Sequence, residues 1–157
     1  MGWDSITSAA CLAALAALLL AAGLEDVRKR EIANGKNVAI ALLAPAWWWG
    51  THLPLWPGVA VQLGIGAGAF AVFTLAWMRG MMGGGDVKMI TALALWFPFG
   101  VFARLLVAMS IAGGLITLAI VIDRRLRGSE LEVPYGVAIA VAGLLALREP
   151  ILNHLAS

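Results

Sequence analysis

Long apolar runs, broken by short polar loops, are the feature that most restricts how this chain can fold. A helix needs about 20 apolar residues to cross the hydrocarbon core of a bilayer. The run from Ile6 to Leu24 has that length and carries no charge. Only 13% of the residues are charged, whereas a soluble domain typically carries about 25%. We therefore expect an all-α, polytopic membrane protein.

The apolar runs predict about six transmembrane helices. The first is expected to be retained, because it lacks the basic start and the cleavage site of a signal peptide. Pro98 and Gly100 are expected to separate the fourth run from the fifth. Gly64, Gly66 and Gly68 in the third run favour close helix packing. The expected spans are 6–24, 37–52, 58–78, 87–97, 101–122 and 134–147, within a single integral-membrane domain of residues 1–157.

The positions of the basic residues predict the orientation. Nine of the eleven Lys and Arg residues lie in the loops 25–36, 79–88 and 123–133. Positively charged loops stay on the cytoplasmic side, so these three loops are expected there and both termini outside. The basic residues are spread among short loops, and we expect no nucleic-acid partner.

Two acidic residues occupy unusual positions on this cytoplasmic side. Asp26 follows the first span, and Asp86 follows three glycines, 83–85, at the start of the fourth. Taken singly, Asp26 is also explained by pairing with neighbouring arginines, and Asp86 by capping a helix. Two carboxylates that share a proton, however, provide a base that activates water and an acid that polarises a peptide carbonyl. The pair therefore indicates aspartyl protease chemistry, which needs no metal or other cofactor.

Other kinds of catalytic site find little support. Cys11 is the single cysteine and lies in an apolar run, where a buried hydrophobic role is expected. His52 and His154 are far apart in sequence and have no ligand-like neighbours. The sequence contains no nucleophile elbow, zinc-protease helix or phosphate-binding loop.

Three motifs resemble those of the type IV prepilin peptidases, a family of membrane aspartyl proteases with a Gly-x-Gly-Asp motif. The first, 26–34, has an aspartate, a basic stretch and Ile-Ala-Asn, where Ala33 replaces the usual proline and a looser turn is expected. The second, 83–88, reads Gly-Gly-Gly-Asp-Val-Lys. The third, 133–136, reads Val-Pro-Tyr-Gly and opens the last span. The motifs occur in order, each at the cytoplasmic end of an expected span.

The resemblance implies that Asp26 and Asp86 are the catalytic pair. It implies an endopeptidase that removes the short basic leader of a prepilin or pseudopilin at the cytoplasmic face of the bacterial inner membrane, for pilus biogenesis. The chain lacks the cysteine cluster of the larger, methylating members, so it is similar to the peptidase-only branch of tight-adherence (Flp) pilus systems. Site-shaping or substrate-binding roles are expected for Arg30, Asn34, Gly83, Gly85, Lys88, Pro134, Tyr135 and Gly136.

Two alternatives stay open at this point. An archaeal preflagellin peptidase shares the aspartate arrangement, and a non-catalytic membrane component of pilus assembly needs no dyad. A transporter fits less well, because it would place a functional carboxylate near the membrane midplane rather than at span ends. The sequence also leaves open a homodimer through small-residue helix faces.

Overall fold

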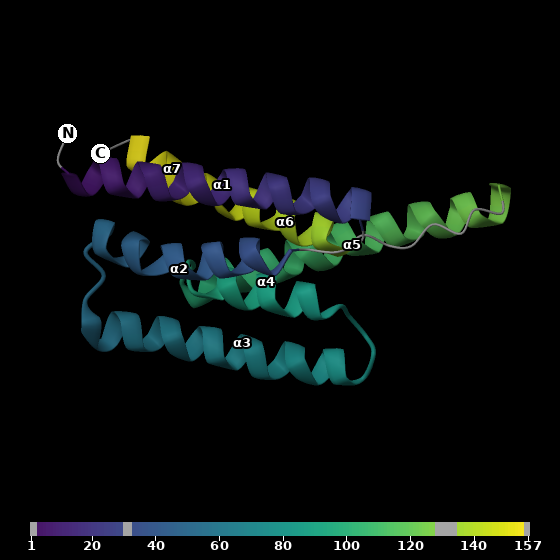
Figure 1. Ribbon diagram of the computed structural model, residues 1–157, viewed down its shortest axis with the longest axis horizontal. Helices are drawn as coiled ribbons and strands as arrows, with labels where there is room; N and C mark the ends of the chain where they lie inside the picture. Colours follow the sequence, from purple (N-terminus) through teal and green to yellow (C-terminus); the bar gives the residue numbers. More distant parts are fainter. Residues whose placement is uncertain (1–2, 30–32, 128–134, 156–157) are drawn as a thin grey trace.

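The computed structural model describes residues 3–29, 33–127 and 135–155, and these are helical with short connections. Figure 1 shows the helices running side by side along the long axis of the molecule. The expected all-α architecture is confirmed. The helices are α1 (Trp3–Lys29), α2 (Asn34–Gly50), η1 (Leu55–Val59), α3 (Ala60–Met78), α4 (Gly84–Ala94), α5 (Phe99–Arg127), α6 (Tyr135–Ala146) and α7 (Arg148–Leu155).

Four of the described helical segments are long and apolar enough to cross a bilayer. They are Ile6–Lys29, Leu55–Met78, Phe99–Asp123 and Tyr135–Leu152, and they match the first, third, fifth and sixth expected spans. Helices α2 and α4 coincide with the other two expected spans but have only 17 and 11 residues. The multi-pass membrane architecture is therefore supported, while the count of about six spans stays a prediction.

The short helix α4 ends inside the protein. Its 11 residues extend over about 16 Å, roughly half the thickness of a bilayer core. The Gln62 side chain of α3 donates hydrogen bonds to the carbonyl oxygens of Ala94 and Phe97, both at 2.7 Å. The Trp48 indole N–H donates to the carbonyl of Leu95 at 2.9 Å. Carbonyls at a helix end in apolar surroundings need such partners, so these side chains make the ending of α4 possible.

The loss of the Gln62 side-chain amide should therefore destabilise the protein. Gln62 is buried, so Gln62→Leu leaves two carbonyl oxygens without a donor, which costs about 1–3 kcal/mol of folding free energy. We expect a lower melting temperature in detergent. Ser110→Ala is the control, because the Ser110 hydroxyl is exposed and bonds to a carbonyl of its own helix. Equal melting temperatures for the two variants would contradict this account.

The break between α4 and α5 falls where a proline predicts it. Residues 95–98 form a turn and α5 begins at Phe99, so the break expected at Pro98 is confirmed, while Gly100 lies within α5. Of the three α3 glycines, Gly66 faces a close neighbour: a Cβ there would come 2.6 Å from Leu95. A Cβ at Gly64 or Gly68 would meet no described atom within 4 Å. Close packing is therefore confirmed for one glycine of the three.

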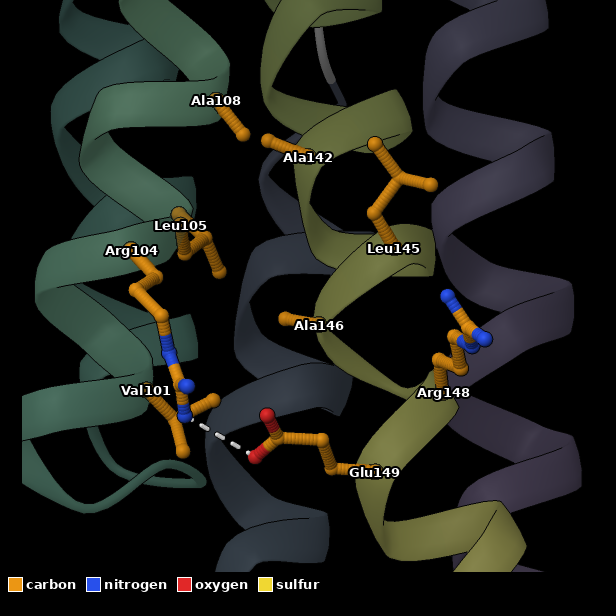
Figure 2. Close-up of a pocket in the computed structure, with 9 residues that line it drawn as sticks. All are labelled: Val101, Arg104, Leu105, Ala108, Ala142, Leu145, Ala146, Arg148 and Glu149. Carbon is orange, nitrogen blue, oxygen red and sulfur yellow. Dashed lines mark hydrogen bonds and ion pairs between the residues drawn. The ribbon is translucent and has the colours of Figure 1, made fainter.

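At the end of the bundle where α4 terminates, an ion pair joins α5 to α7. Arg104 Nη2 lies 3.0 Å from Glu149 Oε2, and Figure 2 shows the two side chains meeting beside a pocket of about 280 Å³. Both side chains are more than half exposed. A pair of this kind contributes about 0–1 kcal/mol, so it fixes this end only weakly.

Candidate active site

The two aspartates lie at the other end of the bundle. Asp26 is near the C-terminal end of α1, and Asp86 is in the first turn of α4. Figure 1 shows that these helix ends lie together with the N-terminal end of α6. The fold thus places residues from three distant parts of the sequence at one end of the bundle, as the motif positions predicted.

Asp26 is a buried carboxylate at the N-terminus of α6. Only 6% of the residue is exposed, and Oδ2 accepts a hydrogen bond from the backbone N–H of Val137 at 3.2 Å. Val137 is the third residue of α6, where backbone N–H groups have no partner within the helix. The positive end of the helix dipole also favours a negative charge here. The Val137 N–H and this helix end therefore favour the charged form of the Asp26 carboxyl, whereas its burial opposes it.

The Tyr-Gly part of the third motif builds this helix end. Tyr135 and Gly136 are the first residues of α6, and Gly136 is buried. The Tyr135 ring lies against α5, where a Cβ on Gly113 would come 3.2 Å from the ring. Pro134 and Arg30, which the motifs also singled out, lie outside the described residues. The described part of the motif sets the position of the N–H groups that face Asp26.

Two glycines that the sequence reasoning missed bring α1 and α6 together. A Cβ on Gly23 would lie 3.0 Å from the Cβ of Ala140, and one on Gly143 would lie 2.9 Å from a methyl group of Leu19. Gly23 precedes Asp26 by about one helical turn. The close approach therefore sets how near Asp26 comes to the end of α6. The only signal in the sequence was a glycine one turn before the aspartate in an alanine-rich run.

Asp86 folds back onto the glycine motif. Its Oδ2 accepts a hydrogen bond from the backbone N–H of Gly83 at 3.3 Å, which caps the start of α4. A Cβ on Gly83 would lie 3.1 Å from this same oxygen. The backbone angles of Gly83 are ordinary extended values, with φ of −74°. The first glycine of the motif is thus needed for space beside the carboxylate rather than for its backbone freedom.

Two contacts fasten the first turn of α4 to the first turn of α2. The Asn37 amide donates to the carbonyl oxygen of Gly85 at 3.2 Å, and Lys88 Nζ donates to Asn34 Oδ1 at 2.7 Å. Asn34 and Lys88 were both expected at the site, and the fold brings them together. Asn37 was not singled out, although it is a buried polar residue at the edge of an apolar run. The Asn37 contact holds the backbone just before Asp86, and the Lys88 contact joins a side chain of α4 to α2.

Glu25, the neighbour of Asp26, fastens the basic loop. It accepts hydrogen bonds from Lys36, from Lys29 at 3.4 Å, and from the backbone N–H of Ala33 at 3.2 Å. A proline at position 33 has no N–H to donate. Ala33 therefore makes a hydrogen bond that the usual proline cannot form, while the looser turn expected here stays a prediction.

The two carboxylates influence each other electrostatically. Asp86 precedes the expected fourth span, and its pKa is raised from 3.8 to about 6. Burial is the main cause, the negative charge of Asp26 adds to it, and the Gly83 N–H opposes it. A shared proton is the expected behaviour of two carboxylates in one site. Asp86 therefore keeps its proton to a higher pH than an ordinary aspartate does.

The raised pKa of Asp86 predicts a pH-dependent gain in stability when this carboxyl is replaced. The folded protein retains the Asp86 proton at pH values where the unfolded chain has lost it. The stability linked to this proton is present below about pH 4 and is lost as the pH rises through about 6. Asp86→Asn should therefore raise the melting temperature more at pH 8 than at pH 5. Glu149→Gln, an exposed control at the opposite end, should show no such difference, and an equal shift for Asp86→Asn at both pH values would refute the prediction.

Comparison with known proteins identifies the family of the chain. The model of the type IV leader peptidase family matches residues 13–122, which include both aspartates and the glycine motif. No curated protein and no solved structure matches the chain. The family match covers more than half of the sequence, and the fold adds apolar helices suited to a membrane. The chain therefore belongs to the type IV leader peptidase family, the prepilin-type aspartic proteases of membranes.

Proposed function

We propose that this chain cleaves the short basic leader from a prepilin or pseudopilin at the cytoplasmic face of the bacterial inner membrane, with Asp26 and Asp86 as the catalytic pair. The observation that carries the proposal is that α1 and α4 bring these two carboxylates to one end of the bundle (Figure 1), and the contribution of the Asp26 charge to the raised pKa of Asp86 agrees with it. Membership of the leader peptidase family supports the reaction class. The absence of a cysteine cluster supports the peptidase-only, Flp-type branch without N-methylation.

The surroundings of the two aspartates support a division of roles between them. Asp26, held by the N-terminus of α6, is the charged base that removes a proton from water as the water oxygen attacks the scissile carbonyl carbon. Asp86, with its raised pKa, gives its proton to the carbonyl oxygen. When the tetrahedral intermediate collapses, the C–N bond breaks and the leaving amine takes the proton from Asp26. The two carboxyls return to their starting states after Asp86 regains the proton from the carbonyl oxygen.

The remaining motif residues support the pair. Gly83 leaves room for the Asp86 carboxylate, and the Lys88–Asn34 contact keeps α2 against α4. Tyr135 and Gly136 begin the helix that faces Asp26. Gly85 presents the carbonyl that Asn37 holds. For Arg30 and Pro134 we retain the roles implied by their motifs, in orienting the basic loop and in starting the last span.

A reconstituted cleavage assay tests the proposal. The purified chain in liposomes is mixed with an Flp-type prepilin that carries a short basic leader ending in glycine. The mass of the product is then measured by mass spectrometry. We expect loss of the leader alone, and no loss in liposomes without the chain. A preflagellin substrate, run in parallel, distinguishes the archaeal-type alternative. If folded chain leaves both substrates intact, the non-catalytic pilus component becomes the better explanation.

A further inference from the structure

A groove runs between α2 and α3 next to the proposed dyad. Helix α4 lies between these two helices, as Figure 1 shows, and forms the floor. The groove has a volume of about 320 Å³. Its lining is mostly apolar, and its polar residues, such as Asn34 and Lys88, lie toward Asp86. The residues that matter here are Asn34, Asn37, Phe70, Lys88, Thr91 and Leu95.

Two buried oxygens beside this groove have no hydrogen-bond partner among the described residues. They are Asn37 Oδ1 and Thr91 Oγ1. Asn37 is only 4% exposed, and its amide nitrogen is already used to hold the carbonyl of Gly85. Buried polar groups in folded proteins are nearly always paired, and an unpaired one calls for an explanation. Both residues line the same groove, which points to a ligand that brings N–H groups.

We propose that this groove binds the substrate segment that follows the cleaved bond. A protease acts on an extended backbone, whose N–H groups lack the internal partners of a helix and need acceptors in apolar surroundings. Asn37 and Thr91 supply two acceptors at the polar end. Beyond them, Phe70 and Leu95 offer an apolar surface for the hydrophobic helix of the substrate. This inference rests on the proposed function and adds where the substrate lies.

The polar end of the groove favours a peptide over a lipid. An acyl chain has no donor and would leave Asn37 Oδ1 and Thr91 Oγ1 unpaired. The groove also lies directly beside the glycine motif, because Asn37 lines the groove and donates a hydrogen bond to the carbonyl of Gly85, the residue before Asp86. When the scissile peptide bond lies at Asp86, the substrate chain that follows it can therefore extend directly into this groove.

Site-specific photo-crosslinking tests this placement. p-Benzoylphenylalanine is introduced at Phe70 or at Val72 in the Asp86→Asn chain, which keeps the prepilin uncleaved. Both positions are about half exposed, at 52% and 62%, but residues two apart point to opposite sides of a helix. We expect a crosslink to the Flp-type prepilin from position 70 and none from position 72. Equal crosslinking from the two positions, or none from position 70, would overturn the placement.

A filled groove provides a second test, with activity as the readout. Ala41→Phe adds bulk inside the groove, whereas Ala39→Phe adds it on another face of α2, outside the groove lining. We expect a raised KM for Ala41→Phe and a KM close to wild type for Ala39→Phe. Cleavage by the wild type together with an unchanged KM for Ala41→Phe would overturn the groove alone. A wild-type chain that does not cleave the prepilin would instead overturn the proposed function itself.

Discussion

Replacing Asp26 or Asp86 by asparagine is expected to lower the rate of leader cleavage by at least about 100-fold, because each variant loses one of the two proton transfers. Asparagine keeps the shape of the side chain and its carbonyl oxygen can still accept the N–H of Val137 or Gly83. The fold should therefore survive while the chemistry does not. Initial cleavage rates of the purified variants, at matched amounts of folded protein, provide the measurement.

The double variant sharpens this first prediction. Residues that act as one catalytic unit give losses that do not add, so Asp26→Asn with Asp86→Asn should be no slower than the worse single variant. Glu149→Gln, an exposed carboxylate change at the opposite end of the bundle, should cleave at the wild-type rate. Retention of cleavage within tenfold of wild type by either single variant would refute the two-aspartate mechanism.

Replacing Gly23 by leucine is expected to damage both folding and cleavage while leaving both aspartates in place. Even a Cβ at this position would lie 3.0 Å from the Cβ of Ala140, so a leucine must push α1 away from α6. Overpacking of this kind costs about 1–3 kcal/mol of folding free energy. It also separates Asp26 from the Val137 N–H. We therefore expect both a lower melting temperature and a loss of cleavage.

The matched control for this change is Gly64→Leu. A Cβ at Gly64 meets no described atom within 4 Å, although this glycine also lies in a helix suited to a membrane. The control should keep its melting temperature and its cleavage rate, and the comparison isolates the contact from the general effect of removing a glycine. Similar losses in the two variants would show that the α1–α6 approach has no special part in positioning Asp26.

Much of the fold was predictable because it depends on local composition. The spans 6–24, 58–78 and 101–122 were placed close to the helices that the structure contains, because lipid solvent demands continuous apolar helices. The short lengths of α2 and α4 were harder to foresee. Helix α4 can end early only because Gln62 and Trp48 donate hydrogen bonds to the carbonyl oxygens at its end. Nothing in the sequence around either residue predicts that contact.

Some residues of the candidate site were likewise predictable from the sequence, and others were not. Sequence motifs were enough to select Asp26, Asp86, Asn34 and Lys88, and the fold brings the last two into contact. The buried Asn37 and the close approach at Gly23 depend on which helix lies opposite each residue. A single sequence does not contain that information in a local form, so these residues were found only in the folded chain.

By itself the sequence determined that this chain is an apolar helical protein with two unusually placed carboxylates, one after the first span and another after three glycines. It did so because the cost of charge and of unpaired backbone in lipid restricts where such groups can occur. Only the tertiary structure decided how the two carboxylates differ. Asp26 accepts an N–H at the start of α6, whereas Asp86 accepts the Gly83 N–H at the start of α4, where the charge of Asp26 helps to raise its pKa. Packing, rather than residue type, sets these local surroundings.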